Sequence, residues 1–573
     1  MRQSHSISFA QAVLLAGLLL ACGILSAQSE HSVSVQAKAL MEAHAWQRVI
    51  DVLAPVQVRT ADEQFWFGSA LAHVGRWNEA EAAFAAGEKA NPRDARFPEE
   101  RAGVAFHEKR YADAARLLRR TLRLSPEDAY ARDFLATVYY LDGNLPAALK
   151  YWNLGGKPMI AAVRQDPPMR IDPALLDRAF AFAPESELHL KDFLNTRARL
   201  EGLGVFPQFT MELPARSDGR FDALLRAQEL NGFGTSRWQM AATLLVGLPF
   251  QSVHLDAYNL RREAINITSM YRWDAQKRRV EAELAMPFER RAAYRLNFAL
   301  DLRDENWVVR ESFTGVAPSL GSMNMRREAL RFDLASHATE KLEWQAGAEL
   351  SHRDFRSVAD GPALTADLLA KGYALKQVAR VRSVLWRVPE RRLVVRATGE
   401  SDAGRLWSSS PEAFEKLTGS LGWHWFPKAQ GIDYAMAHRV SAGRTWGTVP
   451  FDELTMLGLE RDNNLPLRAH IGTRDGKKGS APLGRNYVLS NWEMDKNLYT
   501  NGIVTAQVGP FVDAGAISDP NAALGSHEWL VDVGAQAKLR VFGKGVAFSY
   551  GHDTRTGNNA FYVTLLHTST GGE

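Results

Sequence analysis

The C-terminal half of the chain alternates apolar and polar side chains with a period of two. The segment WLVDVGAQAKLRV shows the pattern most clearly. Its apolar positions are Val531, Val533, Ala535, Ala537, Leu539 and Val541, and they oppose Asp532, Gln536, Lys538 and Arg540. YRLNFALDL, from Tyr294, and ALRFDL, from Ala329, repeat the pattern. Such alternation predicts antiparallel strands with two unlike faces, about sixteen of them between Ser236 and Leu566.

Two architectures use strands of this kind. In a soluble sandwich the apolar face is core and the polar face meets water, whereas in a membrane barrel the apolar face meets lipid and the polar face lines a wet lumen. Eleven of the fifteen tryptophans lie in this half, as interfacial girdles require. Those expected near strand ends are Trp273, Trp307, Trp386, Trp407, Trp446 and Trp529. We therefore expect a transmembrane barrel over residues 232–567.

The N-terminal part repeats every 34 residues. This spacing links Ala80, Ala114 and Ala148, and also Trp77, Tyr111 and Leu145. A period of 34 is the signature of tetratricopeptide helix pairs, in which small residues sit where two helices cross. We expect an all-α solenoid over residues 32–156, with Gly68, Ala80, Ala114 and Ala148 as packing positions. Its concave surface would bind a periplasmic protein partner, or the repeats would serve as a spacer.

A small α+β unit follows the repeats, over residues 165–229. The sequence predicts a short strand from Met169, a helix capped by Asp172, a helix from Glu187 to Leu203, and strands over 206–215 and 220–228. This βααββ order, and the segment TRARLEGLGVFPQFTMELPARSDGRFDALLRAQE within it, resemble a POTRA domain. That resemblance implies a module that receives polypeptides.

Residues 1–27 read as an export signal, with Arg2 before an apolar stretch and small residues at its end. The only cysteine, Cys22, leaves two processing routes open: acylation of Cys22, or ordinary cleavage after Ala27. No later run of about eighteen apolar residues exists, so strands must make any membrane crossing. The net charge of +4 is nearly balanced and gives no reason to expect nucleic-acid binding.

A polar, glycine-rich segment, Leu465 to Asp495, lies between amphipathic strand patterns. The strand after it places Thr505, Gln507, Phe511 and Asp513 on one face. A guanidinium in a partly desolvated lumen needs a carboxylate, so Arg468 and Asp513 are candidate partners. The alternative is a surface strand with solvated charges worth about 0 to 1 kcal/mol per pair.

PFDELTMLGLERDNNLPLRAH, NWEMD and GPFVDAG resemble segments of the outer-membrane assembly and translocation superfamily that includes BamA, TamA and the two-partner secretion transporters. The resemblance implies that Arg468 anchors a loop inside the barrel, with Glu493, Phe511 and Asp513 as its partners. The sequence departs from the family at Ala469 and His470, where a glycine and an aromatic are usual.

The final strand, NNAFYVTLLH, has Phe561, Val563 and Leu565 on one face and should close the barrel against a first strand near Ser236 to Val246. The terminal aromatic that barrels of this type usually carry is replaced by His567 and TSTGGE.

No catalytic motif is present: HEKRY and HEWLV lack the second histidine of a zinc protease, and GTRDGKKGS is too short for a phosphate loop. We therefore expect no enzymatic activity, no cofactor and no metal site. Lys477 and Lys478 are expected in a lumen or at a loop tip.

The sequence predicts an outer-membrane protein with its N-terminal domains in the periplasm. Its expected partners are outer-membrane lipid and unfolded outer-membrane or secreted polypeptides, which it would insert or translocate. The alternatives are a glycan-export porin with a tetratricopeptide scaffold, and a passive pore or anchor.

Overall fold

The computed structural model describes residues 33–234, 244, 247–311, 317–407, 412–427, 433–500, 504–541 and 544–566. The chain divides into two compact units, residues 1–155 and 156–573. The predicted export signal with Cys22, most of the predicted first strand from Ser236 to Val246, and His567 lie outside the described residues. Within the described part, no helix is long and apolar enough to cross a membrane.

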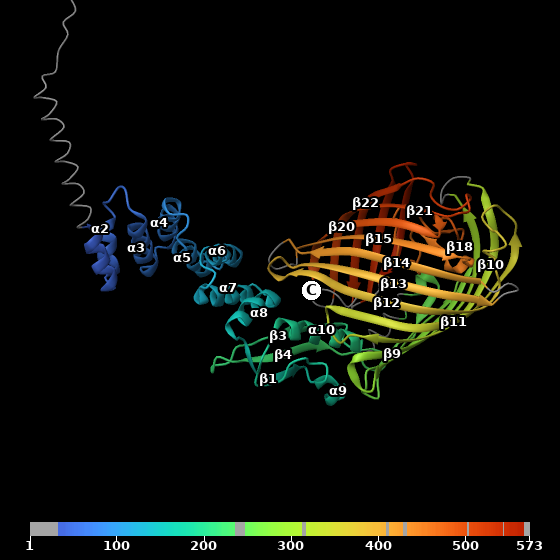
Figure 1. The fold of residues 1–573 in the computed structure, drawn as a ribbon, viewed down its shortest axis with the longest axis horizontal. Helices are drawn as coiled ribbons and strands as arrows, with labels where there is room; N and C mark the ends of the chain where they lie inside the picture. The colour runs from blue at the N-terminus through green and yellow to red at the C-terminus, as the bar shows by residue number, and fades with distance from the viewer. Residues whose placement is uncertain are drawn as a thin grey trace, which may run out of the picture. The chain divides into compact units, whose positions relative to one another are not determined.

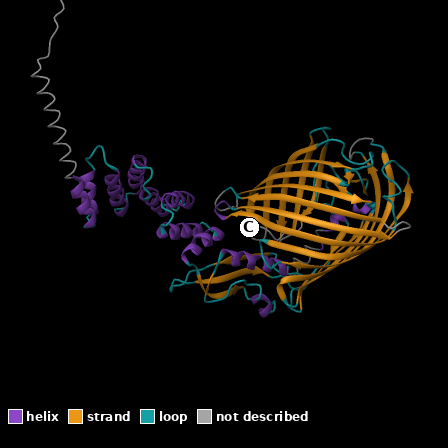
Figure 2. Ribbon diagram, viewed as in Figure 1, coloured by secondary structure: helices purple, strands orange, loops and turns teal. Residues whose placement is uncertain are grey.

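The first unit is a stack of helical hairpins (Figure 2). After a helix over residues 33–42 come α2 (Trp46–Leu53), α3 (Ala61–His73), α4 (Trp77–Ala90), α5 (Arg96–His107), α6 (Tyr111–Leu124), α7 (Ala129–Leu141) and α8 (Leu145–Trp152). The second helix of each hairpin begins at the repeated positions Trp77, Tyr111 and Leu145, which confirms the predicted repeat.

Small residues set the helix spacing in this unit. Ala80, Ala114 and Ala148 are fully buried. A Cβ added to Gly68 would lie 2.6 Å from the ring of Phe84, so only glycine lets α3 approach that ring. The predicted packing residues are therefore buried in the helix stack.

The second unit begins with a small α+β domain, called the βααββ domain below, in which an additional two-residue strand lies between the two helices. Its elements are β1 (Met159–Asp166), α9 (Pro173–Asp177), β2 (Ser186–Glu187), α10 (Leu190–Leu203), β3 (Gln208–Glu212) and β4 (Phe221–Gln228). The sheet order is β2-β1-β4-β3, with β1 parallel to β4 and β3 at an edge. As predicted, the Asp172 side chain caps α9.

The prediction of a first strand from Met169 was wrong, because the strand lies earlier. Pro167 follows the end of β1 and has no N–H to continue a ladder. The N–H groups of Arg170 and Ile171 instead donate to the Glu229 carboxylate, each at 2.6 Å. A side chain thus takes the bonds that a strand would need, and the segment folds as a loop.

This domain is fixed to one end of the barrel by polar contacts with strand-joining turns and nearby strand residues. Arg295 donates to the Gly202 carbonyl at 2.5 Å, and Asn266 donates to the Leu203 carbonyl at 3.0 Å. Both carbonyls lie at the C-terminus of α10, whose last carbonyls have no partners within the helix. Arg199 also reaches the Ala338 carbonyl at 3.3 Å, in the turn before β11. The barrel therefore caps the helix that faces it.

The rest of the second unit is an antiparallel barrel (Figures 1 and 2). Its wall comprises β5 (Ser252–His254) with β6 (Ala257–Leu260), β7 (Ile265–Trp273), β8 (Lys277–Phe288), β9 (Arg291–Arg310), β10 (Ser319–Ser336), β11 (Leu342–Ala359), β12 (Gly372–Val388), β13 (Leu393–Trp407), β14 (Glu412–Trp425), β15 (Tyr434–Gly447), β20 (Asn486–Thr500), β21 (Val504–Ser518), β22 (Leu530–Val541), β23 (Lys544–Asp553) and β24 (Asn559–Leu566). Neighbouring strands pair in sequence order, except that β15 pairs directly with β20. β24 neighbours β5, which closes the barrel.

The two faces of the wall differ as the alternation predicted. On β10, Leu330 and Phe332 are exposed on the outside, whereas Arg327 and Asp333 are buried. The outward face is an apolar band and the inward face is polar, which is the reverse of a water-soluble barrel with a dry core.

One tryptophan departs from the expected girdle. Five of the six named tryptophans are exposed, but Trp307 is 9% exposed and belongs to a buried cluster with Phe451. The ring centroids are 5.0 Å apart in an edge-to-face arrangement. Trp307 therefore holds a loop inside the barrel instead of marking a membrane interface.

Candidate functional site

The candidate site is the loop between β15 and β20, which we call the luminal loop (residues 448–485). It contains η4 (Phe451–Glu453), β16 (Thr455–Met456), β17 (Thr473–Arg474), β18 (Lys477–Lys478) and β19 (Leu483–Gly484). Following the strands in order, β15 ends and β20 begins at the barrel end opposite the βααββ domain. The loop enters the barrel from that end.

Apolar packing holds one side of the loop against the wall. Phe451, Met456 and Leu483 share a buried cluster with wall residues, among which are Trp307, Met323, Met325 and Phe355. At Lys478, β18 forms a parallel bridge to Trp307. A Cβ on the next residue, Gly479, would lie 2.6 Å from the Val308 carbonyl oxygen, so this close approach requires glycine. The loop is therefore packed against the inner wall.

Arg468 anchors the other side of the loop. Its Nε and Nη2 donate to the two carboxylate oxygens of Asp513, each at 2.8 Å, and its Nη1 donates to Glu493 at 3.0 Å. The guanidinium carbon lies 3.9 Å from the centre of the Phe511 ring. Arg468 is 5% exposed and Asp513 is fully buried. The structure thus brings together the four residues named from the sequence, in a bidentate ion pair over an aromatic face.

Further polar groups complete this anchor. Gln536 accepts from Arg468 Nη1 at 2.7 Å and donates to Glu493 at 2.9 Å. Lys538 donates to Glu493 at 2.8 Å and to Asp495 at 2.6 Å. The alternation had already placed Gln536 and Lys538 on the polar face of their strand, but it gave no sign that this face meets Arg468. That information lies in the register of β20, β21 and β22.

The unusual pair Ala469 and His470 has partners of its own. The Ala469 N–H donates to Asp532 at 2.6 Å, and His470 Nδ1 lies 3.1 Å from the same oxygen. His470 Nε2 lies 3.8 Å from Asp553. The residues that depart from the family pattern are therefore bound to β22 and β23, next to the Arg468 anchor.

His470, Asp532 and Asp553 are also a group with metal-ligand character. One ligand atom from each lies within 4.8 Å of the others. A histidine nitrogen with two carboxylate oxygens suits zinc or a similar divalent ion. In the structure His470 Nδ1 is within hydrogen-bond distance of Asp532, whereas Nε2 is not within that distance of Asp553. The expectation of no metal site stays a prediction.

The predicted closing strand, β24, pairs with β23 along its length. Phe561 is 61% exposed, whereas Val563 and Leu565 are partly covered. Lys478 is 2% exposed and pairs with Glu305 at 2.8 Å, so it lies in the lumen.

Known proteins resemble the chain only distantly. No protein-family model matches it, and no curated protein matches its sequence. Among solved structures, BamA from Haemophilus ducreyi lacking POTRA domains 1–3 is 12% identical, with 71% of this chain and 84% of that chain covered and a TM-score of 0.38. CdiB from Escherichia coli is 12% identical, with coverages of 72% and 75% and a TM-score of 0.45. MamA is 16% identical over 26% of this chain and 93% of its own, with a TM-score of 0.22.

The structural neighbours are thus BamA-like and CdiB-like barrels for most of the chain, and a repeat protein for its N-terminal part. At these TM-scores the fold assignment rests on the chain's own strand pairing and helix repeat.

Proposed function

We propose that this chain is an outer-membrane barrel that inserts outer-membrane proteins into that membrane or carries polypeptides across it. The main observation in support of this proposal is the Arg468 anchor. It fixes a long loop inside the lumen through partners on three neighbouring strands, β20, β21 and β22. A passive pore has no need of such a loop. No catalytic step is required, because the work is positioning and release of a polypeptide.

The periplasmic side of this proposal rests on the βααββ domain and the repeats. In the sheet order, β3 is an edge strand, and Gln208, Thr210 and Glu212 on it are exposed. An edge strand offers unpaired backbone groups to which an extended client can add. The βααββ domain would receive the client, and the repeats would bind a periplasmic partner.

The rival function is glycan export, which also joins tetratricopeptide repeats to a barrel. A glycan channel requires a continuous polar path, and in the described part of the chain the luminal loop is packed across the inner wall. This favours the polypeptide function. Surface polysaccharide in a deletion strain remains the property that separates the two.

The test combines depletion with crosslinking in the cell. A photo-crosslinker at Thr210 on β3 should capture unfolded outer-membrane or secreted polypeptides, whereas the same group at the exposed Lys191 on α10 should capture few. Depletion should lower a subset of outer-membrane or secreted proteins. Intact protein levels, equal capture at both positions and loss of surface polysaccharide would together refute the proposal.

A further inference from the structure

A row of five arginines crosses the inner wall of the barrel. Arg272 on β7 is directly opposite Arg279 on β8, which is opposite Arg303 on β9. Arg303 is opposite Arg327 on β10, which is opposite Arg353 on β11. Like charges directly opposite each other destabilise a sheet. A row of this kind is therefore stable only when carboxylates lie against it.

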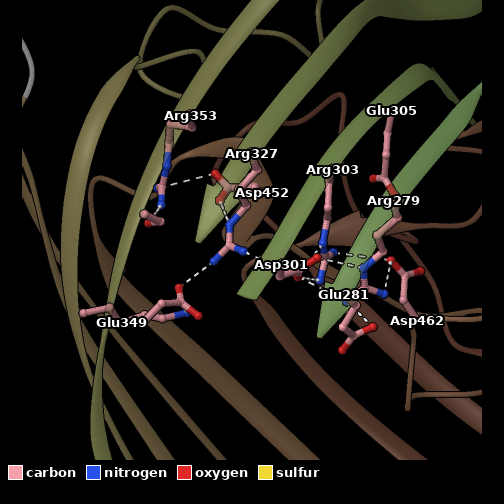
Figure 3. Close-up of polar contacts among 12 residues, drawn as sticks. Arg279, Glu281, Asp301, Arg303, Glu305, Arg327, Glu349, Arg353, Asp452 and Asp462 are labelled. Carbon is pink, nitrogen blue, oxygen red and sulfur yellow. Dashed lines mark hydrogen bonds and ion pairs between the residues drawn. The ribbon is translucent and has the colours of Figure 1, made fainter. Parts of the chain in front are cut away.

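The row faces the lumen, and three of its five members are buried. Arg353, Arg272 and Arg327 are 1%, 5% and 7% exposed. The neighbouring residue Arg326, on the outer face of β10, has a side chain that is 54% exposed. Figure 3 shows four of the arginines on adjacent strands, with carboxylates between and beside them. The arginines of the row are therefore an ordered, paired set inside the barrel and not separate charges exposed to solvent.

The luminal loop supplies a large part of the negative charge that the row needs. Asp452 lies 3.0 Å from Arg327 and 3.4 Å from Arg353. Asp462 lies 3.3 Å from Arg303 and also pairs with Lys478 of the loop at 2.6 Å. Beside the row, Glu453 pairs with Lys376 at 3.1 Å. The wall adds carboxylates of its own, chiefly Asp301 and Glu349.

The row has more donors than these carboxylates use. Within the described residues, Nε of Arg353 and Nε of Arg272 make no hydrogen bond, and Nη1 of Arg353 has only the 3.4 Å ion pair with Asp452. A cavity of about 340 Å³ adjoins the Arg272 and Arg279 end of the row, and its charged lining also includes Arg461, Asp256, Glu281, Glu283 and Asp462. Buried donors without acceptors are costly, and the Arg272 donor belongs to a residue that lines this cavity. The Arg272 end of the row therefore has space, and a donor without a hydrogen bond, for a further carboxylate.

We propose that the arginine row is a docking track for an acidic polypeptide segment, and that Asp452, Glu453 and Asp462 of the luminal loop occupy it until such a segment displaces them. The proposal rests on the proposed function only for the source of the segment. Binding itself is a property of the purified chain.

The occupant in the structure indicates the class of ligand. The groups against the row are side-chain carboxylates on a polypeptide, and guanidinium groups pair with carboxylates in a planar, two-bond geometry. Exchange between one set of carboxylates and another keeps every buried charge paired, so it avoids the large cost of leaving an arginine alone. The loop thus acts as an internal competitor.

The test measures binding of a fluorescent oligoglutamate peptide to the full-length protein in detergent, with oligoglutamine as the control peptide. The double variant Asp452→Asn with Asp462→Asn should bind oligoglutamate at least about tenfold more tightly than the wild type, because the internal competitor is weakened. Adding Arg327→Gln and Arg353→Gln to that variant should abolish the gain. Adding Arg326→Gln instead, one residue away on the outer face, should leave the gain in affinity unchanged.

Heat-modifiable mobility identifies the folded barrels that enter the comparison. If the arginine variants do not fold, the comparison of wild type with the loop variant still decides, since the same gain is required. Equal binding by those two proteins would overturn the proposal. Preference for polygalacturonate, an anionic polysaccharide, over oligoglutamate would also overturn it. Peptide binding without any effect of depletion on outer-membrane or secreted proteins would refute the proposed function and leave the docking track intact.

Discussion

The interiors of the two compact units are stabilised by different chemistry. In the repeats, Ala80, Ala114 and Ala148 are buried without any polar side-chain atom, and Gly68 gives the Phe84 ring its space. In the barrel, the most deeply buried side chains include Arg353, Asp513 and Asp532. Volume decides the packing of the first unit, whereas pairing of charges decides the interior of the second.

Inside the barrel, the luminal loop contributes a positive charge at one contact with the wall and negative charges at another. At one anchor the loop contributes the cation, Arg468, and the wall contributes Asp513 and Glu493. At the arginine row the loop contributes Asp452 and Asp462, and the wall contributes the cations. A loop placed the other way round would bring like charges together. The charge pattern therefore fixes which side of the loop faces which wall.

The largest effect is expected from Arg468→Ala. This change leaves the buried Asp513 carboxylate without its cation, and loss of one partner of a buried pair costs about 3–5 kcal/mol. The loss of stability is measured from the temperature at which the protein loses the mobility of the folded barrel on a gel. The stability of Arg468→Lys should lie between that of the wild type and that of Arg468→Ala, because lysine cannot pair bidentately with a carboxylate. The exposed control, Arg326→Ala, should cost about 0–1 kcal/mol; a similar cost for Arg468→Ala would remove the contrast.

A double-mutant cycle tests the contact between the luminal loop and the arginine row. Arg327→Gln and Asp452→Asn remove the two ends of one buried pair, so their combined effect should fall short of the sum by about 0.5–3 kcal/mol. The matched cycle on the exposed pair Arg326 and Glu328 should show a coupling of about 0–1 kcal/mol. Both cycles are read from thermal unfolding in detergent. Strict additivity at Arg327 and Asp452 would mean that the acidic residues do not hold the loop.

In the repeats the decisive property should be volume. Gly68→Ala adds a Cβ against the Phe84 ring and should destabilise the unit by about 1–3 kcal/mol. Gly103→Ala, at a helical glycine with nothing within 4 Å, should instead stabilise it by up to about 1 kcal/mol. Circular dichroism of helix loss in urea measures both. Effects of the same sign would show that the packing account of this unit is wrong.

The smallest effect concerns one acid in the repeats. Burial, with the nearby Asp128 and Glu100 carboxylates, raises the pKa of Glu99 to about 7. Between its ordinary pKa and 7 the folded protein holds a proton that the unfolded chain releases, so stability should fall as pH rises through this window. Glu99→Gln should reduce the difference in thermal midpoint between pH 5 and pH 8. An unchanged difference would exclude Glu99 as its source.

The sequence predicted the repeats well because their signal is local. A spacing of 34 residues identifies the positions that pack, and the same residues then begin α4, α6 and α8. The period of two likewise predicted the faces of the wall strands. Both patterns depend on residues that are close along the chain.

What the sequence did not predict depends on register between distant segments. Trp307 looked like an interfacial tryptophan, but only the pairing of β9 and the course of the luminal loop bring it against Phe451. The arginine row is invisible in any one strand, since each strand contributes a single member. The strand predicted from Met169 failed because Glu229, far along the chain, takes its backbone donors.

Single-channel conductance of the purified protein in planar bilayers, with and without the luminal loop, tests whether the loop lies inside the barrel. Replacing residues 449–484 by a short glycine-serine linker removes both anchors and the apolar contacts between them. If the loop lies inside the lumen as described, the wild type should conduct weakly and the variant should conduct several times more. Heat-modifiable mobility checks that both proteins are folded. Equal conductance of the two proteins would contradict the placement of the loop and, with it, the central claim.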